Sequence, residues 1–329
     1  MIDALVFAAN AVLPIVLLIV LGYVLKRIGL LSAPFLEVGN KLTFRVLLPA
    51  MLFYNVYQIE SFSEINPVFV LYGIGMVIVI FLLAVAVTCA FTKDGAKRGS
   101  LIQAMFRSNY AIIGIPLATS LFGDKGAAAA GVMSAFCVPM FNMLGVITLS
   151  IFNGNGEKGK INVPRILLGI VKNPLIIGTV AGLAVLGIRE LFVLWSIDFR
   201  FSDITFLYKS LENVKSICTP FALIVLGGRF EFSAVSRLWK EIVFGTVIRT
   251  VAVPVLGLAG AFLIPGLGGE HFATYVGVFA TPVAVASAIM ASEMGADGEL
   301  AGQLVVWTSL VSTVTIFLYV TILRAVGIF

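Results

Sequence analysis

A small number of polar residues interrupt the apolar sequence, and these are the candidates for chemistry. Arg107 and Asn109 lie within one apolar run, and Pro116 follows Asn109 by seven residues, close to two helical turns. A guanidinium and an amide both offer hydrogen-bond donors, which is the chemistry that holds a carboxylate. Asn109 therefore suits an anion-binding site, although a hydrogen bond between two helices would explain it equally well.

Two predicted membrane helices contain a proline near their middle. Pro116 follows Gly114 in the first, and Pro282 follows Thr281 in the second. A proline removes one backbone donor and clashes with the carbonyl four residues before it, and in lipid the freed groups must face protein, water or a ligand. Because proline suits the first turn of a helix, segments starting near Pro116 and Pro282 would direct their positive ends toward the crossing of the two helices. Such a crossing favours an anion.

These two breaks define the predicted substrate site. The predicted substrate-binding residues are Asn109, Gly114, Ile115, Pro116, Thr281 and Pro282, and the predicted supporting residues are Arg107, Asn173, Asn55 and Asn142. Single prolines are common in membrane helices, so Pro139 and Pro254 are interpreted as ordinary kinks.

The sequence offers no catalytic or metal-binding set. His271 is the only histidine and stands beside Glu270, and the three cysteines are isolated in apolar sequence. Glu212, Glu241 and Glu293 fall near predicted helix ends, which argues against a buried carboxylate pair for sodium or proton antiport. We therefore expect no enzyme activity, no metal and no cofactor. The net charge of +5 comes from scattered loop residues, so we expect no nucleic-acid partner.

Composition places the chain in a lipid bilayer. Hydrophobic residues make up 60% and charged residues 12% of the 329 residues, too few charges for a soluble surface. A bilayer core needs about 20 apolar residues as helix. Ten windows fit, at 5–25, 41–58, 67–91, 99–121, 126–152, 166–188, 210–228, 241–264, 273–292 and 301–326. We predict an all-α integral membrane protein with a single domain, residues 1–329, that crosses a cell membrane, the bacterial inner membrane, ten times.

Proline spacing indicates an internal repeat. Three prolines in the first half have counterparts in the second at offsets of 160, 171 and 166 residues: Pro14 with Pro174, Pro49 with Pro220, and Pro116 with Pro282. We predict repeat one at 1–152 and repeat two at 166–329, with chance alignment of apolar sequence as the alternative. Five helices in each repeat would invert the second repeat relative to the first. The broken fourth and ninth helices would then cross near the membrane midplane, as in secondary transporters.

The ordered set of these residues resembles the auxin efflux carrier family over nearly the whole chain. Asn109, Gly114, Ile115, Pro116 and Leu117 match its fourth-helix pattern, Asn173 and Pro174 its sixth, Arg249 and Pro254 its eighth, and Ala280, Pro282, Ala291 and Glu293 its ninth. Plant members have a second asparagine where this chain has Leu175, and a long loop where this chain has the short segment 153–164. The resemblance is therefore to the bacterial branch.

The resemblance implies a scaffold of helices 1, 2, 6 and 7 and a moving transport bundle of helices 3 to 5 and 8 to 10. It implies an elevator-type secondary transporter, a homodimer formed through the scaffold, and a substrate that is a small organic anion. That anion would be a carboxylate such as malonate, malate or an auxin-like acid. The alternative functions are a sodium- or proton-coupled symporter of another substrate class, and a channel.

The distribution of basic residues predicts the orientation in the membrane. Thirteen lysines and arginines fall on one side of the predicted membrane and five on the other. By the positive-inside rule the richer side is cytoplasmic, which places both termini outside the cell. An epitope added after Phe329 should therefore bind antibody on intact cells, whereas one inserted beside Lys93 should bind only after the cells are opened. The reverse pattern would invert the predicted topology.

Overall fold

The computed structural model describes residues 2–58, 66–152 and 163–329, and in these ranges every regular element is helical. The predicted all-α fold is therefore confirmed. Within the described residues five helical segments are long and apolar enough to span a membrane: Pro67–Phe91, Tyr110–Ile151, Pro174–Leu194, Ser233–Phe262 and Gly298–Ala325. The count of ten crossings and the inverted repeat stay predictions.

The first half of the chain alternates long helices with short π-helical turns. Its elements are α1 (Ile2–Arg27), α2 (Ala33–Leu42), η1 (Thr43–Leu47), α3 (Leu48–Tyr57), α4 (Pro67–Phe91), α5 (Gly95–Phe106), η2 (Tyr110–Gly114) and α6 (Ile115–Ile151). Side-chain caps fix where three of these helices begin, because a side-chain oxygen accepts from free backbone N–H groups, as Ser32 does at α2. Asn66 caps α4 in this way, and Asp94 caps α5.

The second half follows the same pattern. Its elements are α7 (Val163–Val171), α8 (Pro174–Leu194), the 3-10 turn η3 (Phe201–Asp203), α9 (Thr205–Gly228), α10 (Ser233–Val247), η4 (Ile248–Ala252), α11 (Val253–Phe262), α12 (Gly269–Tyr275), η5 (Val276–Ala280), α13 (Val285–Glu293) and α14 (Gly298–Ala325). Asn173 caps α8, and its amide oxygen accepts from the Leu175 N–H at 2.9 Å.

A sharp bend divides α6 into two parts. It lies between residues 121 and 126, where one predicted window ends and the next begins. Gly123 has φ 55° and ψ −135° there, and no atom lies within 4 Å of the position that a Cβ would take. Side chains other than hydrogen are strongly disfavoured at such backbone angles, so glycine permits the chain to reverse at this point.

Four prolines follow a π-helical turn by two residues. Pro49, Pro116, Pro254 and Pro282 come after η1, η2, η4 and η5 respectively. Because a π turn shifts the hydrogen bonds from i+4 to i+5, it removes the clash between the proline ring and the preceding carbonyl. The helix therefore continues through Pro49, Pro116 and Pro254, and only at Pro282 does it stop.

This corrects the predicted position of the first break. The interruption lies at Arg107–Asn109, before η2, so the helical segment begins at Tyr110 and not near Pro116. The interruption in the other helix lies at residues 281–284 and includes Pro282, as predicted.

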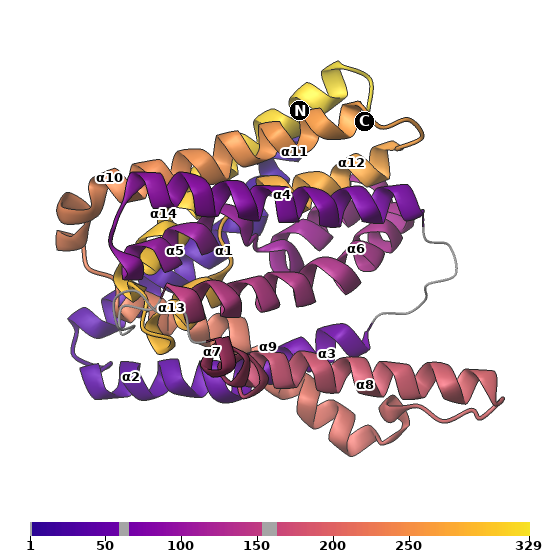
Figure 1. Ribbon diagram of the computed structural model, residues 1–329, viewed down its shortest axis with the longest axis horizontal. Coiled ribbons are helices and arrows are strands. Elements are labelled where there is room, and N and C mark those ends of the chain that lie inside the picture. Colours follow the sequence, from indigo (N-terminus) through magenta and orange to yellow (C-terminus); the bar gives the residue numbers. More distant parts are fainter. Residues whose placement is uncertain (1, 59–65, 153–162) are drawn as a thin grey trace.

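The helices pack in two groups, which contact each other most extensively where α1 packs on α14. In one, α3 lies against α8 and α9, and α9 against α1; in the other, α6 packs on α12, α4 on α5, and α14 on both α10 and α13. Figure 1 shows α3, α8 and α9 along one side of the molecule and α4, α10 and α11 along the opposite side. In this view the marks of the two chain ends both lie beside α11.

Arg249 joins the interrupted helices from within η4. Its side chain is fully buried, and its guanidinium donates to the carbonyls of Thr281 (2.7 and 2.8 Å), Val278 (3.1 Å) and Met105 (3.0 Å). These carbonyls stand at the C-terminal ends of η5 and α5, where a helix leaves its last acceptors unpaired and carries partial negative charge. The Arg249 guanidinium thus pairs with backbone carbonyls at the C-terminal ends of both interrupted helices.

We expect Arg249→Met to reduce the free energy of unfolding by about 3 kcal/mol or more, because three buried carbonyls would lose partners worth about 1–3 kcal/mol each. Thermal unfolding of the purified protein in detergent measures this as a lower Tm. Arg45→Met is the matched control, since Arg45 lies exposed on η1. Equal Tm values for the two variants would contradict the role given to Arg249.

Candidate functional site

The two interrupted segments pair with each other as a short antiparallel bridge. The Asn109 N–H donates to the Pro282 carbonyl at 2.8 Å, and the Ala284 N–H donates to the Arg107 carbonyl at 3.3 Å, on either side of Ser108 and Val283. The backbone groups freed by the interruptions are therefore satisfied by one another. The broken helices cross at this bridge.

A small cavity of about 60 Å³ lies beside the bridge, on the side where the new helices begin. Residues 107–112 line it from the start of η2, and residues 284–286 line it from the start of α13. The first N–H groups of a helix carry partial positive charge and lack partners within the helix. The positive N-terminal ends of η2 and α13 therefore lie at the cavity. The negative C-terminal ends of α5 and η5 instead contact Arg249.

Arg107 places a full positive charge at this cavity. Its side chain is 4% exposed, and its guanidinium donates to Asn142 Oδ1 at 2.5 Å and to Gln103 Oε1 at 3.3 Å, with Met290 Sδ also in contact. In the described part of the chain it forms no ion pair, and no Asp or Glu lines the cavity. A buried cation without a carboxylate partner is costly, so the site favours an added anion.

Three buried polar atoms without partners belong to residues that line the same cavity. Asn109 Nδ2, Asn142 Nδ2 and Ser108 Oγ are buried and make no hydrogen bond within the described residues, and all three side chains belong to the cavity lining. Buried polar groups in proteins are nearly always paired, so unpaired amides and a hydroxyl mark a place where a ligand or water completes the bonding. Together with Arg107 they present donors that suit a carboxylate.

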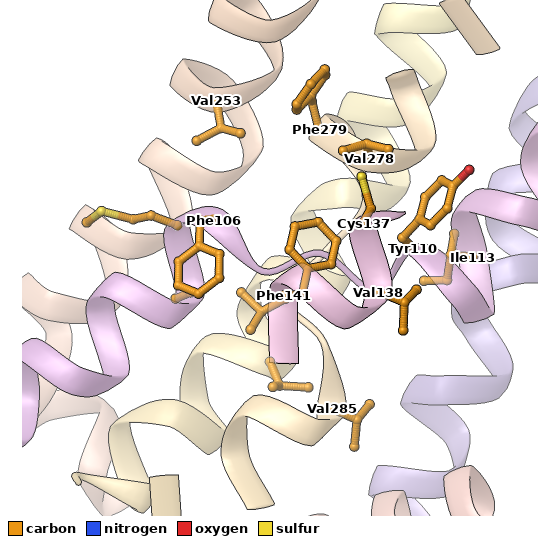
Figure 2. Close-up of a cluster of buried hydrophobic side chains, with 14 of the residues drawn as sticks. Phe106, Tyr110, Ile113, Cys137, Val138, Phe141, Val253, Val278, Phe279 and Val285 are labelled. Atoms are coloured by element: carbon orange, nitrogen blue, oxygen red, sulfur yellow. The ribbon is translucent and has the colours of Figure 1, made fainter. Parts of the chain in front are cut away.

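Apolar side chains hold the break in place. Figure 2 shows Phe106 and Tyr110 on its two sides, with Phe141 and Cys137 of α6 between them. All four are at most 3% exposed and belong to the main hydrophobic cluster of the molecule. Tyr110 is further fixed because its hydroxyl donates to the Ala130 carbonyl at 2.8 Å. The donors of the cavity therefore stand on a rigid, water-poor support.

Gly114 and Gly277 are the contact point of the two crossing helices. A Cβ added to Gly277 would lie 2.8 Å from the Gly114 Cα, and one added to Gly114 would lie 2.9 Å from the Gly277 Cα. Real side chains do not approach backbone this closely, so both positions need glycine. This contact brings η2 and η5 together.

A larger vestibule of about 820 Å³ adjoins the cavity, and Asn55 and Ala111 line both. Its lining includes the charged residues Asp124, Lys125 and Glu270 together with His271. Burial lowers the pKa of His271, although the Glu270 carboxylate 3.6 Å away opposes this, so the imidazole is neutral at pH 7.

The opposite end of the molecule has a second hollow of about 810 Å³ that shares no lining residue with the cavity. There Asn40 on α2 donates to Glu293 Oε1 at 2.6 Å, which ties α2 to the end of α13. The cavity is thus in reach of the vestibule and separated from the second hollow.

The structure brings four predicted site residues together, since Asn109, Arg107, Asn142 and Asn55 all line the cavity. Ile115 lines the vestibule instead. Thr281 and Pro282 act through their carbonyls, and Gly114 through its close packing. Pro116 is exposed, and Asn173 caps α8 without lining the cavity.

Several cavity residues escaped sequence reasoning. Ser108, Thr219, Met51 and Cys218 line it, and Met290 contacts the Arg107 guanidinium. Only Ser108 carried a signal, a hydroxyl between two polar residues at the break. Met51, Cys218 and Thr219 come from α3 and α9, far away in the sequence, and look like ordinary membrane-helix residues.

An all-α membrane protein with a donor-lined cavity where two interrupted helices cross has the construction of a transport protein. The comparisons with known proteins agree. Residues 7–320 match the family model described as membrane transport protein. The chain belongs to this family, which includes the auxin efflux carriers that the sequence resembles.

Two relatives match most of the length of this chain. An uncharacterized transporter of Methanothermobacter thermautotrophicus is 23% identical over 318 residues, covering 96% of this chain and 98% of the relative. An uncharacterized transporter of Methanocaldococcus jannaschii is 25% identical over 267 residues, covering 78% of this chain and 79% of the relative. The protein is therefore a multi-pass membrane transporter and not an enzyme.

The glycine contact makes a prediction about stability. Gly277→Ala should lower the Tm in detergent, because the methyl group would push η5 away from η2. Gly75→Ala on α4 is the control, as no atom lies within 4 Å of its added Cβ. That control should keep or slightly raise the Tm, since alanine is favoured over glycine in a helix by about 0.5–1 kcal/mol. Indistinguishable Tm values would show that the crossing tolerates the methyl group.

Proposed function

We propose that this protein is a secondary transporter that moves a small organic anion, a carboxylate such as malonate, malate or an auxin-like acid, across the cell membrane. The observation that carries the proposal is the Arg107 guanidinium, which is buried beside unpaired donors of Asn109 and Asn142 without an ion-pair partner in the described residues. An arriving carboxylate would neutralise the cation and pair the amides. Both effects stabilise the bound state.

The packing of the helices supports an elevator-type movement. The proposed scaffold corresponds to α1, α2, α3, α8 and α9, which pack on one another, and the proposed bundle holds both broken helices. The cavity lies between the two groups, because Asn55 and Thr219 belong to the scaffold side and Asn109 and Asn142 to the bundle side. Sliding the bundle along the scaffold would carry the bound anion from one hollow toward the other.

The orientation follows from the proposed topology. With both termini outside, the vestibule faces the exterior and the second hollow faces the cytoplasm. The second hollow is lined by four glutamates and by four basic residues, Lys26, Lys41, Arg229 and Arg237, and the positive-inside rule counts the basic residues alone. The structure would then correspond to an outward-facing form, with the Asn40–Glu293 hydrogen bond on the closed side. We further propose that two copies associate through their scaffolds.

A transport assay tests the proposal. Asn109→Ala and Arg107→Gln should each raise the Kd and the half-saturating concentration of the transported carboxylate about tenfold or more, because a hydrogen bond to a charged group is worth about 1.5–3 kcal/mol. The protein is reconstituted in liposomes, and uptake of radiolabelled acids is measured with a pH gradient, a sodium gradient or neither.

Thr119→Val is the control, because Thr119 lies exposed on α6 and its hydroxyl donates to the Ile115 carbonyl of its own helix. It should transport as the unaltered protein does. Wild-type affinity of Asn109→Ala for every transported acid would remove Asn109 from the site. Flux that does not saturate with substrate would indicate a channel.

A further inference from the structure

Helix α13 borders both the cavity and the second hollow. Residues 284–286 at its start line the cavity, whereas Ala288, Ile289, Ser292 and Glu293 further along line the second hollow. Ala288 and Ile289 are at most 2% exposed although they belong to that lining, and α13 packs against α9, α2 and the turn η1 of the scaffold. A path along α13 from the cavity to this hollow therefore opens when the helix separates from the scaffold.

Two buried asparagines of the scaffold hold the C-terminal end of α13. The Asn40 amide on α2 donates to Glu293 Oε1 at 2.6 Å, and the Asn173 amide at the start of α8 donates to Met294 Sδ at 3.5 Å. Asn40 is 2% exposed and Asn173 is 5% exposed. The ion pairs among the described residues, by contrast, each stay within one of the two groups of helices. The two asparagines thus provide polar links between the scaffold and the bundle.

We infer that Asn40 and Asn173 form a latch that keeps the cavity closed to the second hollow until the bundle moves. This inference rests on the proposed function, in which the bundle slides along the scaffold, and it names the contacts that the movement must break. The bond from Asn40 to Glu293 is the stronger of the two, because hydrogen bonds to a carboxylate are stronger than those between neutral groups. The bond from Asn173 to Met294 is weaker, since a thioether sulfur is a weak acceptor.

The two polar atoms of the Asn173 side chain have different tasks. Its Oδ1 accepts from the Leu175 N–H and caps α8, whereas its Nδ2 reaches Met294 in the bundle. A cap needs only the acceptor, which an aspartate would also supply. The donor is the part of the amide that links the start of a scaffold helix to the end of a bundle helix.

The same end of α13 is also tied within the bundle. The Asp297 N–H donates to the Ala96 carbonyl at 3.1 Å, and the Ser100 hydroxyl of α5 donates to the Asp297 carbonyl at 2.7 Å. These bonds join elements that are proposed to move together, so transport does not require them to break. They provide a matched control for the bonds of the latch.

A buried thiol on α13 tests the latch without any substrate. Ala288→Cys places this reporter at a residue that lines the second hollow and is 2% exposed. The purified full-length protein in nanodiscs is treated with N-ethylmaleimide, and modification at position 288 is followed over time by mass spectrometry, which distinguishes it from modification of the native cysteines. The latched form should react slowly.

Changes at Asn40 should expose the reporter. Asn40→Ala should raise the rate of modification about tenfold or more, because the open form gains population when the bond to Glu293 is lost. Asn40→Asp should raise the rate further, since two carboxylates would then face each other. Adding Glu293→Gln to Asn40→Asp should return the rate toward that of the reporter alone, because the new carboxylate on α2 can accept from the new amide on α13.

Changes at Asn173 and Ser100 separate the latch from general stability. Asn173→Asp keeps the cap of α8 and removes the donor to Met294, so it should raise the modification rate by a smaller factor and keep the Tm. Ser100→Ala is the control, because it removes a buried hydrogen bond at the same end of α13 without touching the scaffold. It should lower the Tm and leave the modification rate unchanged.

The outcomes separate the latch from the proposed transport. Unchanged modification in both Asn40→Ala and Asn40→Asp would overturn the latch, and so would an equal rise in Ser100→Ala. A rise in Asn40→Asp that Glu293→Gln does not reverse would also contradict it. Saturable uptake of a carboxylate together with an unresponsive reporter would remove the latch and leave anion transport standing, whereas a responsive reporter without uptake of any acid would do the reverse.

Discussion

The structure depends on one constraint: backbone N–H and C=O groups inside a membrane must find partners even where a helix stops. Two helices stop here, at residues 107–109 and 281–284, and each interruption leaves one carbonyl end and one N–H end. The fold separates the two kinds of end. Arg249 collects the carbonyls, the antiparallel bridge satisfies the chain between them, and the N–H ends are left to face a cavity.

Many surrounding residues help to keep the carbonyl ends of the interrupted helices apart from their N–H ends. The π-helical turns allow Pro49, Pro116 and Pro254 to remain in continuous helices, so that of the four prolines that follow a described π turn only Pro282 stops its helix. Gly114 and Gly277 allow the crossing to close tightly, and Phe106, Tyr110 and Phe141 fill the space around it. Because these side chains are buried and the backbone is paired, the donors of Asn109, Asn142 and Arg107 are held in position before any ligand arrives.

The all-α membrane fold, the two interrupted helices and the polar cluster around Asn109 could be predicted from the sequence, because apolar windows and in-span polar residues are local signals. The sequence predicts the first break about two turns too late, near Pro116, because proline alone does not reveal a π turn that absorbs its clash. The sequence predicts Asn173 as a supporting residue of the site, and the structure shows it as the cap of α8, which stays compatible with that prediction. Met290 and Thr219 could not be found, since only packing between distant segments brings them to the cavity.

The uncompensated charge of Arg107 has an electrical consequence. Arg107 ends α5, which belongs to the group of helices proposed to move, so its charge would travel with the cavity. With a monoanion bound, the charge of Arg107 in the moving group of helices is neutralised. Without a bound anion, the same group carries this one positive charge. Moving one elementary charge across 100 mV changes the free energy by about 2.3 kcal/mol. A negative cell interior would therefore draw the empty carrier inward and leave the loaded step almost independent of voltage.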